Sequence, residues 1–339
     1  MYYPILRGKS GEYDAWKNVS DKKRSRIEPL FELVAANGVT RDLAKFRDAL
    51  LRASKDRELY AIDLGALRPG EKEESSGLLP FTWLASEFSR TTVEFHAVIH
   101  LDDTAEQLSD AVTAVGAENL ILRIRGAELD PDPAANDQSL RDWCRFHDLS
   151  PADIAIMVDL GSIHGADIHS MTRLADVSLQ WVVNNGPWES VILASGASPE
   201  QISDVQKQSY HYIDRNDAAI WNQMHQKYPD IEYADYGTRS PEQSDGPGFQ
   251  GPLPYLRYTI ADQWVIWREP KDSEGRHSTF YDVCKNIVAH PDFSGANFSW
   301  GDSSIANPPG PGTATQWISY AQNHHMELVS DRLSTLGGA

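Results

Sequence analysis

The sequence predicts an α/β fold: a (β/α)₈ barrel of the TIM type with a C-terminal hairpin-plus-helix extension. Short segments rich in apolar and β-branched residues alternate with longer segments of helical periodicity, the order that β-α-β units produce. Each unit takes roughly thirty residues, which suits such a barrel. Closure also leaves no unpaired edge strand. An open, doubly wound sheet is the alternative. We divide the chain into a barrel, residues 1–239, and an extension, residues 240–339, that packs on it.

The barrel strands are predicted at 3–7, 27–34, 59–64, 95–100, 119–125, 154–160, 190–195 and 231–236. A first helix is expected over 12–18. Thr40 can cap the next helix, in which apolar residues recur at helical spacing. After the seventh strand, Ser198-Pro199-Glu200-Gln201 has the composition of a capping box with proline in the first turn, and it predicts a helix start.

The extension opens with a loop over 240–254, rich in glycine, proline, serine and glutamine. Two β-rich segments, 255–260 and 264–268, flank three polar or small residues and predict a β-hairpin. Helices are expected over 278–289 and 315–333.

Composition limits the classes of function. The formal net charge of −18 disfavours non-specific binding to a phosphate backbone. The chain has no run of eighteen apolar residues and no signal-peptide pattern, so we expect a cytoplasmic protein without a membrane span. Neither Cys144 nor Cys284 belongs to a CxxC pair, and both are expected to be structural thiols.

Ionisable side chains mark most of the predicted strand ends, where TIM-barrel enzymes place their active sites. In chain order the ends carry Arg7 (with Lys9 nearby), Glu32, Asp63, His100, Arg125, Asp159, Ser195 and Asp235. Charged groups buried without a partner are costly, so these must be paired, solvated or bound to a ligand.

One interpretation is a catalytic site for a hard cation. Asp63, His100, Asp159 and Asp235 would be catalytic, and the carboxylates of Glu32, Asp63, Asp159 and Asp235 would hold Mg²⁺ or Mn²⁺. The anionic part of the substrate would be bound by Arg7, Lys9, Arg125 and His324. His324 and His325 are about 100° apart on a helix, so only one of them is expected to face the barrel mouth.

Two other interpretations stay open. In a metal-free site, His100 would act as the base and Arg125 would stabilise an anionic intermediate. Alternatively, the strand ends form internal salt bridges, such as Arg125 with Asp159, and serve only the stability of the barrel.

Several segments resemble a known family, the beta family proteins of phages and bacteria. They are YPILRGK (3–9), IEPLFE (27–32), YADYG (233–237) and FSWGD (298–302), together with Trp317 and Asn323-His324-His325. These segments are spread along nearly the whole chain. The resemblance implies no established activity, but it points to mobile elements and phage conflict.

Two functions follow as hypotheses, and whether the protein is an enzyme is left open. The first is a metal-dependent hydrolase of a phosphoester or nucleotide-like substrate in phage conflict. The second is a non-catalytic module that recognises a protein partner through its Trp- and Tyr-rich extension. The sequence lacks a P-loop, a GxGxxG turn, an HExxH helix and a GxSxG elbow, which disfavours the enzyme classes that use them.

Overall fold

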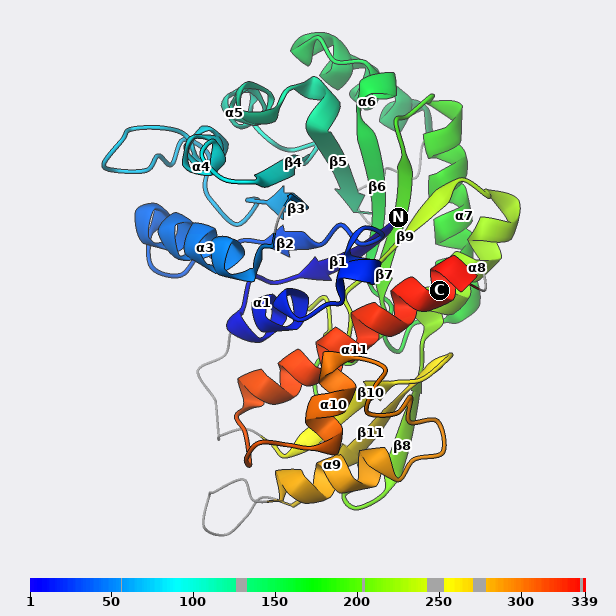
Figure 1. The fold of residues 1–339 in the computed structure, drawn as a ribbon. Coiled ribbons are helices and arrows are strands. Elements are labelled where there is room, and N and C mark those ends of the chain that lie inside the picture. Colours follow the sequence, from blue (N-terminus) through cyan, green and yellow to red (C-terminus); the bar gives the residue numbers. More distant parts are fainter. Residues whose placement is uncertain (56, 126–132, 203–204, 243–252, 271–278, 336–337) are drawn as a thin grey trace.

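Eight parallel strands close into a barrel, as the sequence predicts (Figure 1). The computed structural model describes residues 1–339 except 56, 126–132, 203–204, 243–252, 271–278 and 336–337. The strands follow the order β1-β2-β3-β4-β5-β6-β7-β9, and β9 pairs with β1 to complete the barrel. Their bounds are β1 Tyr2–Leu6, β2 Leu30–Glu32, β3 Glu58–Asp63, β4 Val93–Ile99, β5 Leu120–Arg125, β6 Ala155–Ser162, β7 Val191–Gly196 and β9 Ile231–Asp235.

Helices cover the outside of the barrel, and the longer ones present an apolar face to the strands. In α3, for example, Leu43, Phe46 and Leu50 recur at helical spacing and all three are buried. The helices are α1 Ser10–Lys17, α2 Asp21–Arg24, α3 Val39–Ala53, α4 Pro80–Phe88, α5 Ala105–Val115, α6 Pro133–His147, α7 Ile168–Asn184 and α8 Asn216–Lys227. Two short 3₁₀ turns, η1 Ala117–Asn119 and η3 Pro151–Asp153, precede β5 and β6.

Alternate residues of the strands fill the barrel interior. These inward side chains form a separate apolar cluster, to which β6 contributes Ala155 and Met157, β9 contributes Ala234, and the residue after β9 contributes Tyr236. Because successive side chains point to opposite faces of a strand, the inward series continues into the polar residues at the strand ends. The register of each strand therefore decides which strand-end residues reach the mouth.

The prediction of a helix starting at Ser198 is wrong. Among the described residues between β7 and α8 there is no helix, and the chain instead forms strand β8, Tyr210–Asp214. The Ser198 hydroxyl, which would cap the helix, donates to the Thr238 carbonyl at 3.1 Å and accepts from Arg257 at 2.5 Å. Arg257 also donates to the Pro199 carbonyl at 2.7 Å. These tertiary contacts replace the local capping interaction.

The predicted hairpin is confirmed as β10, Tyr255–Thr259, and β11, Gln263–Arg268, which pair antiparallel. Strand β8 adds to the far side of β11, so a segment between two barrel strands completes this small sheet. The predicted helix over 278–289 is α9, Phe280–Val288; residue 278 lies outside the described residues, as do residues 243–252 of the predicted loop. Helix α10, Trp300–Ala306, was not predicted.

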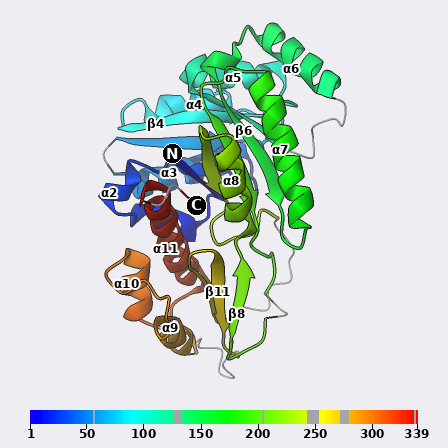
Figure 2. The same ribbon diagram turned by 90° about the vertical axis from the view of Figure 1, so that its right-hand side faces the viewer.

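The last helix, α11 (Ala314–Thr335), joins the two parts of the molecule (Figures 1 and 2). It lies between the small sheet and the barrel and contacts β10 on one side and α1 on the other. Its middle is buried all round, from Trp317 to Ser330 with few interruptions. No helix in the described ranges has the length and apolar character needed to cross a bilayer. Both cysteines are buried free thiols, as expected.

Candidate functional site

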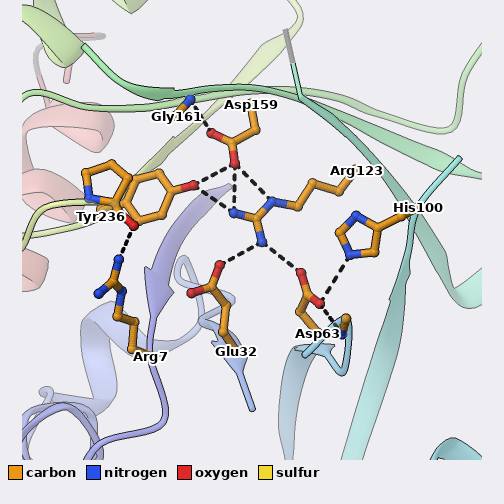
Figure 3. A network of polar contacts seen from close by, with 10 residues as sticks. Arg7, Glu32, Asp63, His100, Arg123, Asp159, Gly161 and Tyr236 are labelled. Atoms are coloured by element: carbon orange, nitrogen blue, oxygen red, sulfur yellow. Dashed lines mark hydrogen bonds and ion pairs between the residues drawn. The ribbon is translucent and has the colours of Figure 1, made fainter. Parts of the chain in front are cut away.

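The guanidinium of Arg123, on β5, lies at the centre of the barrel mouth (Figure 3). Its Nη1 donates to Glu32 Oε1 at 2.9 Å and to Asp63 Oδ2 at 2.7 Å. Its Nε and Nη2 donate to Asp159 Oδ2 at 3.0 and 2.7 Å, and Nη2 also donates to the Tyr236 hydroxyl at 2.7 Å. Four strands, β2, β3, β5 and β6, and the end of β9 are thereby tied to one cation.

This cluster pairs one cation with acidic side chains in a largely buried setting. Arg123 is 2% exposed and Asp159 is 1% exposed. Burial alone would lower the pKa of Arg123, but Tyr236, Asp159 and the other acidic neighbours raise it well above its usual value. Tyr236 in turn donates to Asp159 Oδ2 at 2.6 Å. A buried guanidinium is stable only with such complete pairing, because its desolvation is costly.

Two of the carboxylates are held by the same local turn. The Gly65 amide donates to Asp63 Oδ1 at 2.8 Å, and the Gly161 amide donates to Asp159 Oδ1 at 2.8 Å. In each Asp-x-Gly turn the glycine is two residues after the aspartate, so one oxygen is fixed locally and the other is aimed at Arg123. Gly65 also leaves room, since a Cβ there would lie 3.1 Å from His100 Nε2.

His100 follows β4 and lies beside Asp63, with Nε2 3.2 Å from Asp63 Oδ1. Burial would lower the pKa of His100, but the Asp63 charge outweighs burial and raises it. The pKa of Asp63 is lowered despite its burial, because His100 and Arg123 stabilise the carboxylate. Asp103 accepts from the His100 amide at 2.8 Å and holds the strand end.

A cavity of about 450 Å³ opens beside this pair. Its charged and titratable lining residues are Glu32, Asp63, Asp102, Asp103, His100 and Arg125. Carboxylates thus outnumber the cation Arg125, which is exposed at the end of β5. The wall favours a ligand that carries a cationic or hydrogen-bond-donating group.

The structure does not bring Asp235 or His324 to this mouth. Ala234 and Tyr236 face the barrel interior, so Asp235 faces outward. There Asp235 accepts from Tyr2 and contacts His325 Nε2, each at 2.8 Å. His324 is fully buried between Asp302 and the Thr259 carbonyl, with both ring nitrogens engaged at 2.8 Å.

Two further predicted residues, Arg7 and Lys9, do not line the cavity at the barrel mouth. Arg7 is largely buried at the end of β1 and donates to the Pro241 carbonyl. Lys9 precedes α1 and lines a different cavity, on the outer side of the residues that follow β2.

Arg123 and Tyr236 are the site residues that sequence reasoning missed. Arg123 shares its face of β5 with Arg125, which was predicted, and it lies one step deeper. Tyr236 is adjacent to Asp235, which was predicted. Both side chains face the barrel interior, and the alternation of side chains along a strand would have identified them only if the interior face of each strand had been known.

Three of the four carboxylates predicted to hold a metal ion contact Arg123. Glu32, Asp63 and Asp159 each accept a hydrogen bond from its guanidinium. Across the described part of the chain, no group of three or more His, Cys, Asp or Glu side chains is arranged to hold a metal ion. The donor set therefore does not fit Mg²⁺ or Mn²⁺ while Arg123 is in place.

A family model described as Beta protein matches residues 2–331. The chain belongs to the Beta protein family. Protein beta of Enterobacteria phage P4 is 23% identical over 348 residues, covering 96% of this chain and 91% of that protein. The resemblance seen in the sequence is thus confirmed.

Two solved structures are similar to this family member at low identity. One is the arginine decarboxylase of Paramecium bursaria Chlorella virus bound to agmatine, with a TM-score of 0.35 and 14% identity, covering 69% of this chain and 63% of that one. The other is AQ1208 from Aquifex aeolicus, with a TM-score of 0.34 and 11% identity, covering 69% and 57%. The chain spans less than two thirds of either protein, and likeness this distant says nothing about the reaction.

Proposed function

We propose that this Beta family protein is an enzyme whose barrel mouth binds a small substrate with a cationic group, and that His100 exchanges a proton with it. The observation that carries the proposal is the His100–Asp63 pair, 3.2 Å apart, beside a cavity lined mainly by carboxylates. The site lies at the carboxyl ends of the strands, where barrel enzymes carry out their chemistry.

In this proposal His100 is the acid–base group and Asp63 is its positioning residue. Asp63 engages Nε2, and within the described residues Nδ1 of His100 has no hydrogen-bond partner, so Nδ1 is the atom that would meet the substrate. The Asp63 carboxylate raises the pKa of His100 and so favours its protonated form, and histidine is the side chain that most often transfers protons in catalysis.

The charge of the lining supports a cationic substrate. Glu32 has a quarter of its side chain exposed, and Asp102 and Asp103 line the same cavity. Arg125 would bind an anionic group of the same substrate or stabilise negative charge that develops during proton removal. Such a wall repels a phosphate dianion.

The phosphoester hydrolase that depends on Mg²⁺ or Mn²⁺ has weaker support. Its ligands Glu32, Asp63 and Asp159 are already paired with Arg123, and Asp235 faces away from the mouth. A divalent ion would have to displace a guanidinium that makes five hydrogen bonds in this cluster.

The non-catalytic alternative is also weaker. The abundance of Trp and Tyr in the extension motivated a partner surface, but two of these residues, Trp264 and Trp317, are only 1% and 4% exposed. Trp264 packs in the main cluster of the barrel, and Trp317 packs in the cluster of the extension. A role in conflict between phages and their hosts is kept as part of the proposal, and a protein similar to this chain occurs in phage P4.

Hydrogen exchange into a substrate tests the chemistry. The protein is incubated with amino acids and their esters, whose α-hydrogen is activated by the adjacent carbonyl, in deuterated water containing EDTA, and deuterium at carbon is followed by mass spectrometry. We expect a wild-type signal that His100→Gln loses and that chelation does not affect. A signal that persists in His100→Gln would contradict the assigned base.

Binding is tested separately by calorimetry with 1,4-diaminobutane, and with succinate as the anionic comparison. We expect the diamine to bind at the mouth and succinate not to bind there, so an excess of succinate should not displace the diamine. Glu32→Gln should weaken diamine binding, and preference of the mouth for succinate would contradict the proposed substrate class.

A further inference from the structure

A second cavity, of about 510 Å³, lies between helices α1 and α3, which are neighbours on the barrel (Figure 1). It shares only Leu33 and Val34 with the cavity at the barrel mouth. The residues that follow β2 therefore separate two cavities whose linings differ in charge.

The lining of the second cavity is basic. Four cationic side chains line it: Lys9, Lys17, Lys45 and Arg52. Of the two carboxylates there, Asp42 is engaged with the amides of Ala36 and Asn37, each at 2.7 Å, and Asp14 is exposed. A local excess of positive charge is notable in a chain of net charge −18.

Three of these cations are available to a ligand. Lys17, Lys45 and Arg52 are exposed, and none of them forms an ion pair within the described ranges. A phosphate or carboxylate placed among them would gain charge-assisted hydrogen bonds without breaking an existing ion pair.

A buried, unpartnered hydroxyl provides an independent indication. Tyr13 lines the cavity, is 6% exposed and stacks on Phe31 with ring centroids 4.8 Å apart. Its hydroxyl has no hydrogen-bond partner in the described structure. Gly8 (φ +54°) leaves space beside it, since a Cβ at residue 8 would lie 3.0 Å from the hydroxyl oxygen. A buried hydroxyl without a partner is costly, and a ligand oxygen would satisfy it.

We propose that this cavity is a binding site for a small organic anion, a phosphate or carboxylate attached to an apolar ring or chain. Lys17, Lys45 and Arg52 bind the anionic group, and the Tyr13 hydroxyl donates to it. The apolar part of the ligand lies against Phe46 and Ala49 of α3, which also line the cavity. This site is distinct from the acidic mouth and does not depend on the function proposed for it.

Calorimetry with phenyl phosphate and benzoate tests the proposal, with phenol and inorganic phosphate as partial probes. We expect at least one of the two organic anions to bind, and more tightly than either partial probe. The double variant Lys45→Ala/Arg52→Ala should weaken that binding about tenfold or more, because it removes two ionic hydrogen bonds. Tyr13→Phe should weaken it severalfold while thermal unfolding shows that the fold is kept.

The matched control is Lys22→Ala/Arg90→Ala, which removes the same charge from exposed positions outside the cavity and should leave the affinity unchanged. Arg125→Ala should also leave the affinity unchanged, because Arg125 lines the cavity at the barrel mouth and not the second cavity. The proposal is overturned if neither organic anion binds at millimolar concentration, if Lys45→Ala/Arg52→Ala binds like the wild type, or if Arg125→Ala abolishes binding.

Discussion

A single guanidinium keeps three carboxylates together at the mouth of the barrel. Without Arg123, the side chains of Glu32, Asp63 and Asp159 would repel one another in a buried setting. We expect Arg123→Ala to lower the free energy of unfolding by about 3–5 kcal/mol, the cost of leaving buried charges unpaired. Urea denaturation measures this loss. Arg125→Ala is the matched control on the same strand and should cost less than about 1 kcal/mol, because Arg125 is exposed.

The same variant tests the relation between this arginine and a metal ion. Once Arg123 is removed, the three carboxylates resemble a hard-cation site. We expect Mg²⁺ or Mn²⁺ to raise the melting temperature of Arg123→Ala and to leave that of the wild type unchanged. Stabilisation of the wild type by either ion would favour the metal-dependent site expected from the sequence.

The His100–Asp63 pair should make stability depend on pH in a defined direction. The pKa of His100 is raised in the folded state, so its contribution is full below its unfolded value of about 6.5 and is lost as pH rises through the folded pKa. His100→Gln should therefore cost more stability at about pH 5.5 than at about pH 9. Urea denaturation at both pH values measures this difference. Asp63 stays ionised throughout this window because its pKa is lowered, and an equal cost at both pH values would refute the pairing.

At the scale of elements, the approach of α10 to α11 depends on one glycine. A Cβ at Gly301 would lie 2.2 Å from the Tyr320 carbonyl oxygen and 3.1 Å from the His324 amide nitrogen. Both are backbone atoms of α11, which cannot move away without shifting the helix. We expect Gly301→Ala to lower the free energy of unfolding by about 3 kcal/mol.

The control for that substitution is Gly310→Ala, where an added Cβ would meet nothing within 4 Å. Thermal unfolding of the two variants compares a crowded and an open glycine in the same extension. Similar melting temperatures would mean that α10 and α11 do not approach each other as described.

At the scale of the whole molecule, we expect the barrel and the extension to unfold together. Strand β8 leaves the barrel segment to pair with β11, and α11 contacts both α1 and β10. Buried polar contacts cross the same boundary, including that of His325 with Asp235 at 2.8 Å. In urea, tryptophan fluorescence and far-UV circular dichroism should give one common midpoint.

A truncated chain that ends at residue 239 tests whether the barrel can fold without the extension. It would expose the face of α1 that α11 covers and leave Asp235 without His325. We expect it to fail to fold. A soluble product with native circular dichroism, or two separate transitions in the full chain, would show that the barrel is stable by itself.

The eight barrel strands and the hairpin could be predicted because each depends on local pattern. Apolar, β-branched segments at regular spacing have few other stable arrangements, and closure follows from pairing their edges. The helix predicted at Ser198 failed because the same hydroxyl that can cap a helix is taken by Thr238 and Arg257, which are distant in sequence.

By itself, the sequence determined the barrel, its family and the presence of charged residues at the strand ends. Only the tertiary structure decided which of those residues meet, because a shift of one residue along a strand exchanges the interior for the exterior. Asp159 thus faces Arg123 inside the barrel, whereas Asp235 faces His325 outside it. The partners of a buried charge are chosen by geometry across the whole chain, and no local pattern contains that information.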